Sequence, residues 1–352
     1  MRGAGPAARD RVSSIVFLGD VFLEQPYVLE PPLDGVVVFN LEGPITRARR
    51  GVPGKVNLRV ESNHLRRTFG ESRLVACLAN NHVLDYGAEG LRDTVEELAA
   101  ARIQHFGAGL LAEGCGNGLI IDVGGVAVGL LGYVCPTTGA VFASDDRPGV
   151  LPIDVERIRE DMAEVRRRGA ERIVVCMHWG AEEVYLPRPQ DRERARAVIA
   201  SGADLVIGHH AHRIQPWERY RGRYIFYGLG NFVMPDLAVP AYFDAAGEPG
   251  RQYVKRQRRW NWESLVVRFY PRENELELLR TELDGLSVRA RPVRKGRYRL
   301  RAPRLPGYGS RYRLSYLSGM LRVAMAAYLE RPRLPSRRQL RYVLDLLRSP
   351  AR

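Results

Sequence analysis

Short apolar runs rich in β-branched residues alternate with amphipathic helical patterns through the first 235 residues of this chain. The apolar runs predict strands at residues 14–18, 36–39, 74–79, 173–177, 204–207 and 224–227. The helical patterns lie at residues 88–101, 154–168 and 191–200, and Asp154 is a candidate N-cap. This alternation predicts an α/β fold with helices on the faces of its sheets.

Two predicted hairpins and two further helical patterns complete the chain. The hairpins join residues 118–123 to 126–134 and residues 264–270 to 275–283, and the helical patterns lie at 316–329 and 338–347. We therefore expect a domain at residues 12–245. A segment at 246–352 would contain the closing hairpin and an Arg-rich, partly helical C-terminal extension.

The charge of the chain is concentrated in its last third. The net charge is +14, yet residues 251–352 carry 26 Lys and Arg against 8 Asp and Glu, so the remainder is slightly acidic. Such asymmetry indicates either a surface for an acidic partner or an arginine-rich composition without a special role. The segment has no recognisable DNA- or RNA-binding motif, which disfavours nucleic acid as the partner.

The two C-terminal helical patterns have two interpretations. Their apolar faces can pack against the core, with the arginines simply solvated. They can also bind an anionic membrane surface or an acidic partner, such as a membrane-bound synthase subunit. The pattern at 316–329 is too short to span a bilayer.

Cysteine usage and the N-terminal sequence predict a compartment. The four cysteines are scattered without a CxxC pair, which is typical of reduced thiols. The first twenty residues lack the apolar core of a signal peptide, and no apolar run approaches membrane-spanning length. We expect a cytoplasmic protein, peripheral at most to the inner face of the membrane.

Polar side chains follow the predicted strands where each of them ends. They are Asp20, Asn40 and Glu42, Asn81 and His82, His178, the group His209, His210 and His212, and Asn231. Ligands of open α/β sheets bind at the carboxyl ends of strands, so we expect these side chains to meet. Imidazole, carboxylate and carboxamide donors without thiolates favour a pair of first-row divalent cations over a structural zinc site.

The histidine-rich turn taken alone has a plainer interpretation. A His-x-His is more often part of a solvated loop than a pair of metal ligands. The strand context favours the metal site, because five of the seven histidines follow strands in this way. We also expect this turn to face solvent rather than the core.

Several motifs carry a resemblance to a known family. They are GDV at 19, NLEGPIT at 40, LANNHVLDYGAEGL at 78, HWGAEEVY at 178, GADLVIGHHAHRIQP at 202 and IFYGLGNFV at 225. In this order they resemble the CapA proteins of bacterial capsule and poly-γ-glutamate synthesis, a branch of the calcineurin-like metallophosphatase superfamily. The resemblance implies a four-layer α/β/β/α sandwich of metallophosphatase type over about residues 14–236.

The resemblance also implies a site. The implied metal ligands are Asp20, Glu42, Asn81, His178, His210 and His212, with His82 as the acid. The residues expected around them are Asn40, Asp85, Glu182, His209 and Asn231. His209 is a further ligand or a neighbour, Glu182 orients a ligand or is solvated, and Asn231 is a ligand or a turn residue. Phe22 replaces a histidine usual in the superfamily, so two ions of Mn, Fe or Zn are expected with the second in doubt.

Two functions are compatible with this site. One is metal-dependent hydrolysis of a phosphoester or a related bond, with an anionic polymer or a phosphorylated cell-envelope precursor as the substrate. The other is a non-catalytic assembly subunit of a capsule or poly-γ-glutamate synthase that retains the fold.

Overall fold

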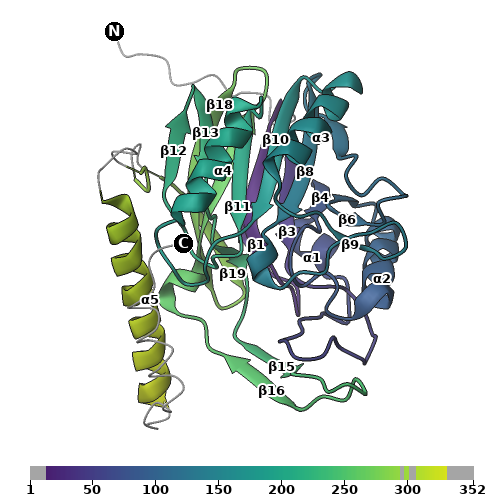
Figure 1. The fold of residues 1–352 in the computed structure, drawn as a ribbon, viewed down its shortest axis with the longest axis vertical. Coiled ribbons are helices and arrows are strands. Elements are labelled where there is room, and N and C mark those ends of the chain that lie inside the picture. The colour runs from purple at the N-terminus through teal and green to yellow at the C-terminus, as the bar shows by residue number, and fades with distance from the viewer. Residues whose placement is uncertain (1–12, 294–296, 301–306, 331–352) are drawn as a thin grey trace.

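The computed structural model describes residues 13–293, 297–300 and 307–330 of the chain, and two β-sheets lie face to face at its centre (Figure 1). The larger sheet has the order β2 (Val28–Glu30), β19 (Ser287–Pro292), β18 (Glu275–Asp284), β17 (Glu263–Tyr270), β1 (Ile15–Val21), β3 (Val36–Leu41), β4 (Arg73–Cys77) and β5 (Gln104–Phe106), and β14 (Asn231–Val233) also pairs with β1. The smaller sheet has the order β12 (Trp217–Tyr220), β13 (Arg223–Phe226), β11 (Leu205–His209), β10 (Arg172–His178), β8 (Ala127–Val134) and β7 (Leu119–Asp122).

Helices cover the outer faces of both sheets. The helices α1 (Leu65–Phe69) and α2 (Gly87–Ala100) pack on the larger sheet, and α3 (Val155–Arg167) and α4 (Pro189–Ala200) pack on the smaller one. Alternation along β10 divides its side chains between two cores. Cys176 faces the larger sheet, whereas Val175 and Met177 pack under α3 and α4. The expected four-layer α/β/β/α sandwich is confirmed.

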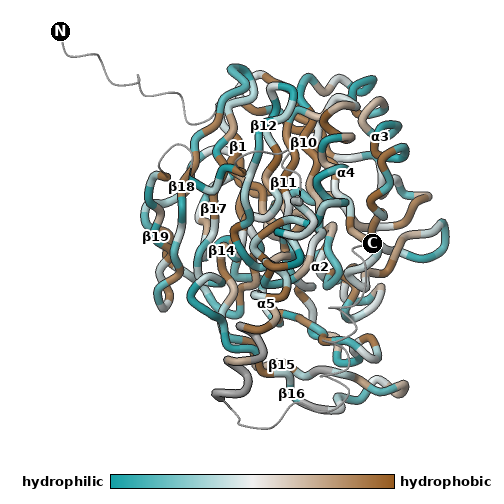
Figure 2. The backbone as a smooth tube through the Cα atoms, turned by 60° about the vertical axis from the view of Figure 1, so that its left-hand side comes forward, coloured by the Kyte–Doolittle hydropathy of each residue, from teal (hydrophilic) through white to brown (hydrophobic). Residues whose placement is uncertain are grey.

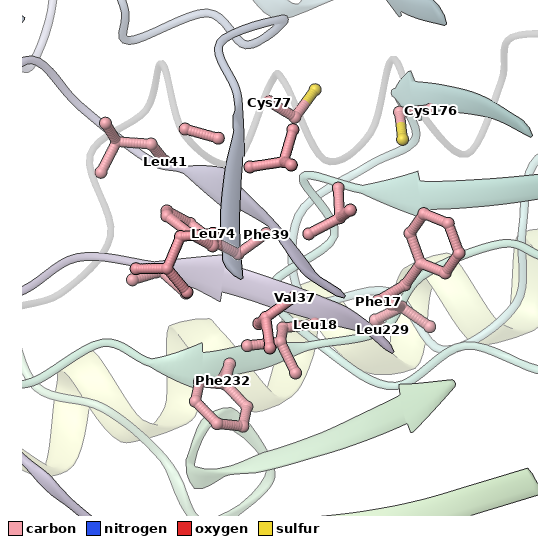
Figure 3. Packing of buried hydrophobic residues seen from close by; sticks show 14 of the residues in the cluster. Phe17, Leu18, Val37, Phe39, Leu41, Leu74, Cys77, Cys176, Leu229 and Phe232 are labelled. Carbon is pink, nitrogen blue, oxygen red and sulfur yellow. The ribbon is translucent and has the colours of Figure 1, made fainter. Parts of the chain in front are cut away.

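Apolar side chains from strands far apart in the sequence fill the space around the larger sheet. Figure 2 shows hydrophobic residues gathered along the strands in the middle of the molecule. Figure 3 shows Phe17 of β1, Phe39 of β3 and Phe232 of β14 within this cluster. The ring of Phe39 also stacks on Phe69 of α1, with 5.5 Å between centroids. Each such ring contributes about 1.5–3 kcal/mol through burial.

The structure confirms both predicted hairpins and the helical cap. Strands β7 and β8 pair antiparallel through Gly124 and Gly125, which have φ of 61° and 77°. Strands β17 and β18 form the second hairpin. The Asp154 side chain accepts a hydrogen bond from the backbone N–H of Arg157, as an N-cap does.

Residues beyond 245 also contribute to the sandwich. Strand β17 pairs antiparallel with β1, so the closing hairpin completes the larger sheet. The division at residue 245 stays a prediction. The helix predicted at 316–329 is part of a longer helix, α5 (Tyr308–Glu330), and the pattern at 338–347 lies outside the described residues. Among the described helices, none combines the length and apolar character needed to cross a membrane.

A further hairpin leaves the sandwich at its lower end in Figure 1. It consists of β15 (Leu237–Ala241) and β16 (Arg251–Lys255), which pair antiparallel. The remaining short elements are β6 (Ala108–Gly109), β9 (Gly149–Val150) and the 3-10 turns Pro136–Thr138 and Arg259–Trp262. We call the segment from β15 to β16 the arm.

Candidate metal centre

The carboxyl ends of parallel strands from both sheets meet at one edge of the sandwich. Strands β1, β3 and β4 are parallel to one another, as are β8, β10 and β11. Asp20 lies in β1, Glu42 follows β3, and His178 ends β10. One ligand atom from each of these three residues lies within 4.8 Å of the others. The three side chains are almost fully buried.

Sheet register fixes the neighbours of Asp20. In the larger sheet Asp20 is the register partner of both Asn40 in β3 and Asn231 in β14. The preceding Gly19 allows this arrangement, because a Cβ atom there would lie 1.9 Å from the carbonyl oxygen of Gly230.

Asn40 orients the two carboxylates. Its Nδ2 donates to Asp20 Oδ1 at 2.8 Å and also to Glu42 Oε2. Asn80 in turn donates from Nδ2 to Asn40 Oδ1 at 3.0 Å. The other oxygen of each carboxylate, Asp20 Oδ2 and Glu42 Oε1, is buried without a hydrogen-bond partner among the described residues.

Imidazoles and a carboxamide surround these free oxygens. Glu42 Oε1 lies 3.8 Å from His178 Nε2 and 3.9 Å from His212 Nε2. His178 Nε2 is 2.8 Å from Asn81 Oδ1, and the ring of His210 lies 4.7 Å from that of His178. The structure therefore brings together all six residues that the resemblance implies as ligands.

His82 lies at the wall of a cavity beside this cluster. Its Nδ1 donates to Asp85 Oδ2 at 2.6 Å, which leaves Nε2 4.0 Å from Glu42 Oε1. Asp85 is itself held by the backbone N–H of Leu58 and by Lys55. A carboxylate on Nδ1 fixes the imidazole so that Nε2 can hold or donate a proton.

The other residues predicted around the ligands have different roles. His209 donates from Nε2 to the carbonyl oxygen of Leu18 at 3.1 Å, which ties β11 to β1. Asn231 Oδ1 accepts from His212 Nδ1 at 2.9 Å, so it orients that ring. Glu182 lines the cavity, and its side chain is 48% exposed.

Burial and charge shift the pKa values at the centre. Burial and the charge of Asp20 raise the pKa of Glu42 to about 7. Burial lowers the pKa of His210 to about 4 and holds that of His178 well below its usual value. Burial and the charge of Lys255 lower the pKa of His212, but the nearby carboxylate of Asp20, 3.3 Å from His212 Nδ1, outweighs them and raises it to about 9.

These residues fit a divalent cation. The free oxygens of Asp20 and Glu42 are buried acceptors that a cation would satisfy, and Nδ1 of His178 and of His210 are also buried without partners among the described residues. Neutral imidazoles, carboxylates and a carboxamide are the donors that Mn, Fe and Zn take. Phe22 supplies no donor, because a phenyl ring has no ligand atom; the residue is buried beside Gly43.

The expectation that the histidine-rich turn faces solvent is wrong. His210 and His212 are only 6% and 5% exposed, because the turn folds inward between the two sheets. Both residues have positive φ, 84° and 51°, a region that costs energy for side chains other than glycine. Such local strain is typical of functional sites.

Sequence reasoning missed three polar residues of this region. Asn80 stands out in the sequence only as a neighbour of Asn81, although its side chain holds Asn40. Lys55 and Lys255 line the cavity beside His82. Lys255 lies in the arm, and no signal in the sequence connects that hairpin to the strand ends.

Comparison with known proteins places most of the chain in one family. The family model described as "Bacterial capsule synthesis protein PGA_cap" matches residues 28–236, which include every predicted site residue except Asp20. The "PGA biosynthesis protein CapA" of Bacillus subtilis (strain 168) is 34% identical over 200 residues, covering 56% of this chain and 52% of the relative.

Two further matches are a second curated relative and a solved structure. A "Probable polyglutamine synthesis accessory protein" of Mycobacterium tuberculosis (strain CDC 1551 / Oshkosh) is 35% identical over 217 residues, covering 58% of this chain and 57% of the relative. This chain thus matches about half the length of these curated relatives. The 5'-nucleotidase precursor from Thermus thermophilus aligns at 15% identity over 89% of this chain and 59% of that chain, with a TM-score of 0.36, too low to add to the argument.

Proposed function

Since the chain belongs to the family of bacterial capsule synthesis proteins described as PGA_cap, we propose that it is a divalent-metal-dependent hydrolase. Its substrate is a phosphoester or a related bond in an anionic cell-envelope precursor or polymer. The observation that supports this most directly is the pair of buried free oxygens on Asp20 and Glu42, which lie beside His178.

The proposed ligands divide into two groups around Glu42. Asp20 and His212 would hold one ion, and Asn81, His178 and His210 would hold the other. When bound, such ions lower the pKa of a coordinated water and neutralise a phosphoryl oxygen.

The residues of the chain have separate tasks in this proposal. Asn40 keeps one oxygen of each carboxylate turned away and the other directed at the ligand cluster. His82 donates a proton from Nε2 to the leaving oxygen, and Asp85 keeps its ring in the orientation that allows this.

Turnover of bis(4-nitrophenyl) phosphate by the metal-loaded chain tests the proposal. We expect hydrolysis that stops when the metal is chelated and returns when Mn²⁺ is restored. A chain that binds metal but turns over neither this diester nor 4-nitrophenyl phosphate would favour the non-catalytic assembly subunit.

Phe22 is the specific observation that favours the assembly subunit. If its lack of a donor leaves one metal position empty, Phe22→His should raise the metal content per chain by up to one ion. Without metal, the buried imidazole should cost about 1–3 kcal/mol of stability. Elemental analysis and thermal melting with and without Mn²⁺ measure both effects.

Phe22→Leu is the matched control, because it removes the ring without adding a donor. A wild-type chain that already holds two ions at full occupancy would rule out an empty position. Another residue would then serve in place of the histidine.

We propose that the basic last third of the chain attaches the protein to an anionic membrane surface near a synthase. Helix α5 packs on the sandwich through Tyr308, whose hydroxyl donates to the carbonyl oxygen of Pro187. On α5, Leu314, Leu321 and Met325 are 58–68% exposed and share one face. The other interpretation is that α5 only packs on the sandwich, through the face opposite these three residues.

Co-sedimentation with liposomes separates these interpretations. We expect the full chain to pellet with phosphatidylglycerol liposomes at low salt and much less at high salt, because exposed charges are screened over about 8–10 Å at physiological ionic strength. Phosphatidylcholine liposomes are the control. Equal failure to pellet with the anionic liposomes at both salt concentrations would leave only the packed helix.

A further inference from the structure

Lysine is rare in this chain, and two of its three lysines lie in one place. The sequence has 54 basic residues, and only Lys55, Lys255 and Lys295 are lysines. Lys55 and Lys255 line the cavity of about 210 Å³ that also contains His82 and His212, and no arginine of the described residues lines it. A chain that otherwise uses arginine almost everywhere thus has compact ammonium groups beside the proposed metal ligands.

Lys55 retains a hydrogen for a ligand. Its Nζ donates to the carbonyl oxygen of Asn81 at 2.5 Å and contacts Asp85 Oδ1 at 2.6 Å. An ammonium group has three hydrogens, so these contacts leave one. The side chain is 25% exposed, at the wall of the cavity.

Lys255 is held more loosely by its partners. Its Nζ lies 3.3 Å from Glu183 Oε1 and 3.7 Å from Glu182 Oε2. Glu183 already accepts hydrogen bonds from Trp260 Nε1 and Asn261 Nδ2. Burial lowers the pKa of Lys255, but the two carboxylates outweigh it and raise the pKa, so the side chain carries its charge near neutral pH.

The arm places both lysines on the same cavity. Lys255 ends β16, and the tip of the arm folds back onto the loop that contains Lys55. There the backbone N–H of Tyr242 donates to the carbonyl oxygen of Lys55 at 3.0 Å, and the ring of Phe243 packs edge-on against Tyr86. These contacts hold the arm and the loop that contains Lys55 together.

We propose that Lys55 and Lys255 form an anion-binding site that selects molecules with an acidic group in addition to the group that meets the metal ligands. This inference rests on the proposed function only where it concerns the reaction. Binding of an anion to the two lysines does not require that reaction. The cavity is smaller than the roughly 300–1,000 Å³ that encloses a drug-sized ligand, so it takes the end of a longer anionic molecule. The acidic group is a carboxylate or a phosphate.

Calorimetric titration of the full chain tests the site with three probes. Tri-γ-glutamate supplies carboxylates, its fully methylated ester removes their charge, and glycerol 1-phosphate supplies a phosphate. We expect the wild type to bind at least one acidic probe roughly 10-fold more tightly than the ester, as charged hydrogen bonds provide. The variant K255M should reduce this ratio several-fold. The acidic probe that loses more affinity in K255M shows whether the site prefers a carboxylate or a phosphate.

Two variants separate anion binding from a structural role. In E182Q/K255M the local charge balance is restored, so the ratio should stay as low as in K255M if Lys255 itself holds the anion. R159M removes an exposed positive charge on α3 and should leave all affinities unchanged. Wild-type protein that binds no acidic probe, or binds acids and ester equally, would overturn the inference, as would a wild-type ratio in K255M.

The outcome does not depend on catalysis. Failure to bind metal or to hydrolyse phosphoesters would count against the proposed function and leave the affinity ratio as it is. Normal turnover of simple phosphoesters without any preference for acidic probes would support the proposed function and contradict the lysine site.

Discussion

Replacing His210 and His212 together by alanine is expected to weaken metal binding by roughly 100-fold or more. Outer partners of metal ligands are worth about 10–100-fold in metal affinity, and a direct ligand should be worth at least as much. Elemental analysis of the dialysed variant measures the loss. His64→Ala is the matched control, because His64 lies outside the cluster, before α1.

The same variant also tests whether these histidines are needed for folding. Both are buried, so the structure predicts some loss of stability in addition to the loss of metal. Thermal melting of the metal-free proteins separates the loss of stability from the loss of metal. If the two histidines serve mainly as metal ligands, the melting temperatures of the metal-free variant and the metal-free wild type should differ little. Full metal occupancy in a folded double variant would show that the histidine-rich turn is not a metal site.

His82→Gln is expected to lower turnover by about 10²–10⁴-fold while metal content stays constant. The size of the loss should depend on the leaving group. An alkyl phosphate needs a proton on its leaving oxygen and should show the full loss, whereas 4-nitrophenolate leaves without help and should show little. The readout is kcat for both ester types.

Asp85→Asn provides a related measurement. It keeps the size of the side chain but weakens the bond that orients the His82 ring. We expect a smaller loss with the same leaving-group dependence. Equal losses for both esters in His82→Gln would contradict proton donation and indicate that His82 contributes to binding.

The sequence predicts the ligand cluster because the ends of the strands can be recognised from the apolar pattern. Asp20, Glu42 and His178 each follow or end a β-branched run, and parallel strands carry such residues to one edge. The four-layer arrangement follows from the resemblance. Its physical basis is visible in β10, where alternate side chains enter different cores.

Other features depend on contacts that no local pattern encodes. The register that pairs Asp20 with Asn231 joins residues far apart in the chain, and it turns Asn231 into a support for His212. The inward turn of His210 brings its ring against that of His178, which ends the neighbouring strand β10. The arm illustrates the same limit, because Lys255 lines the cavity from a hairpin whose tip contacts a distant loop.

The central claim is that the residues gathered around Asp20 and Glu42 hold divalent metal. Elemental analysis of the purified full chain, before and after incubation with Mn²⁺ and dialysis, tests it most directly. We predict one or two ions of Mn, Fe or Zn per chain, and a lower metal content in Asp20→Asn. A folded wild-type chain that retains no metal under either condition would contradict the account.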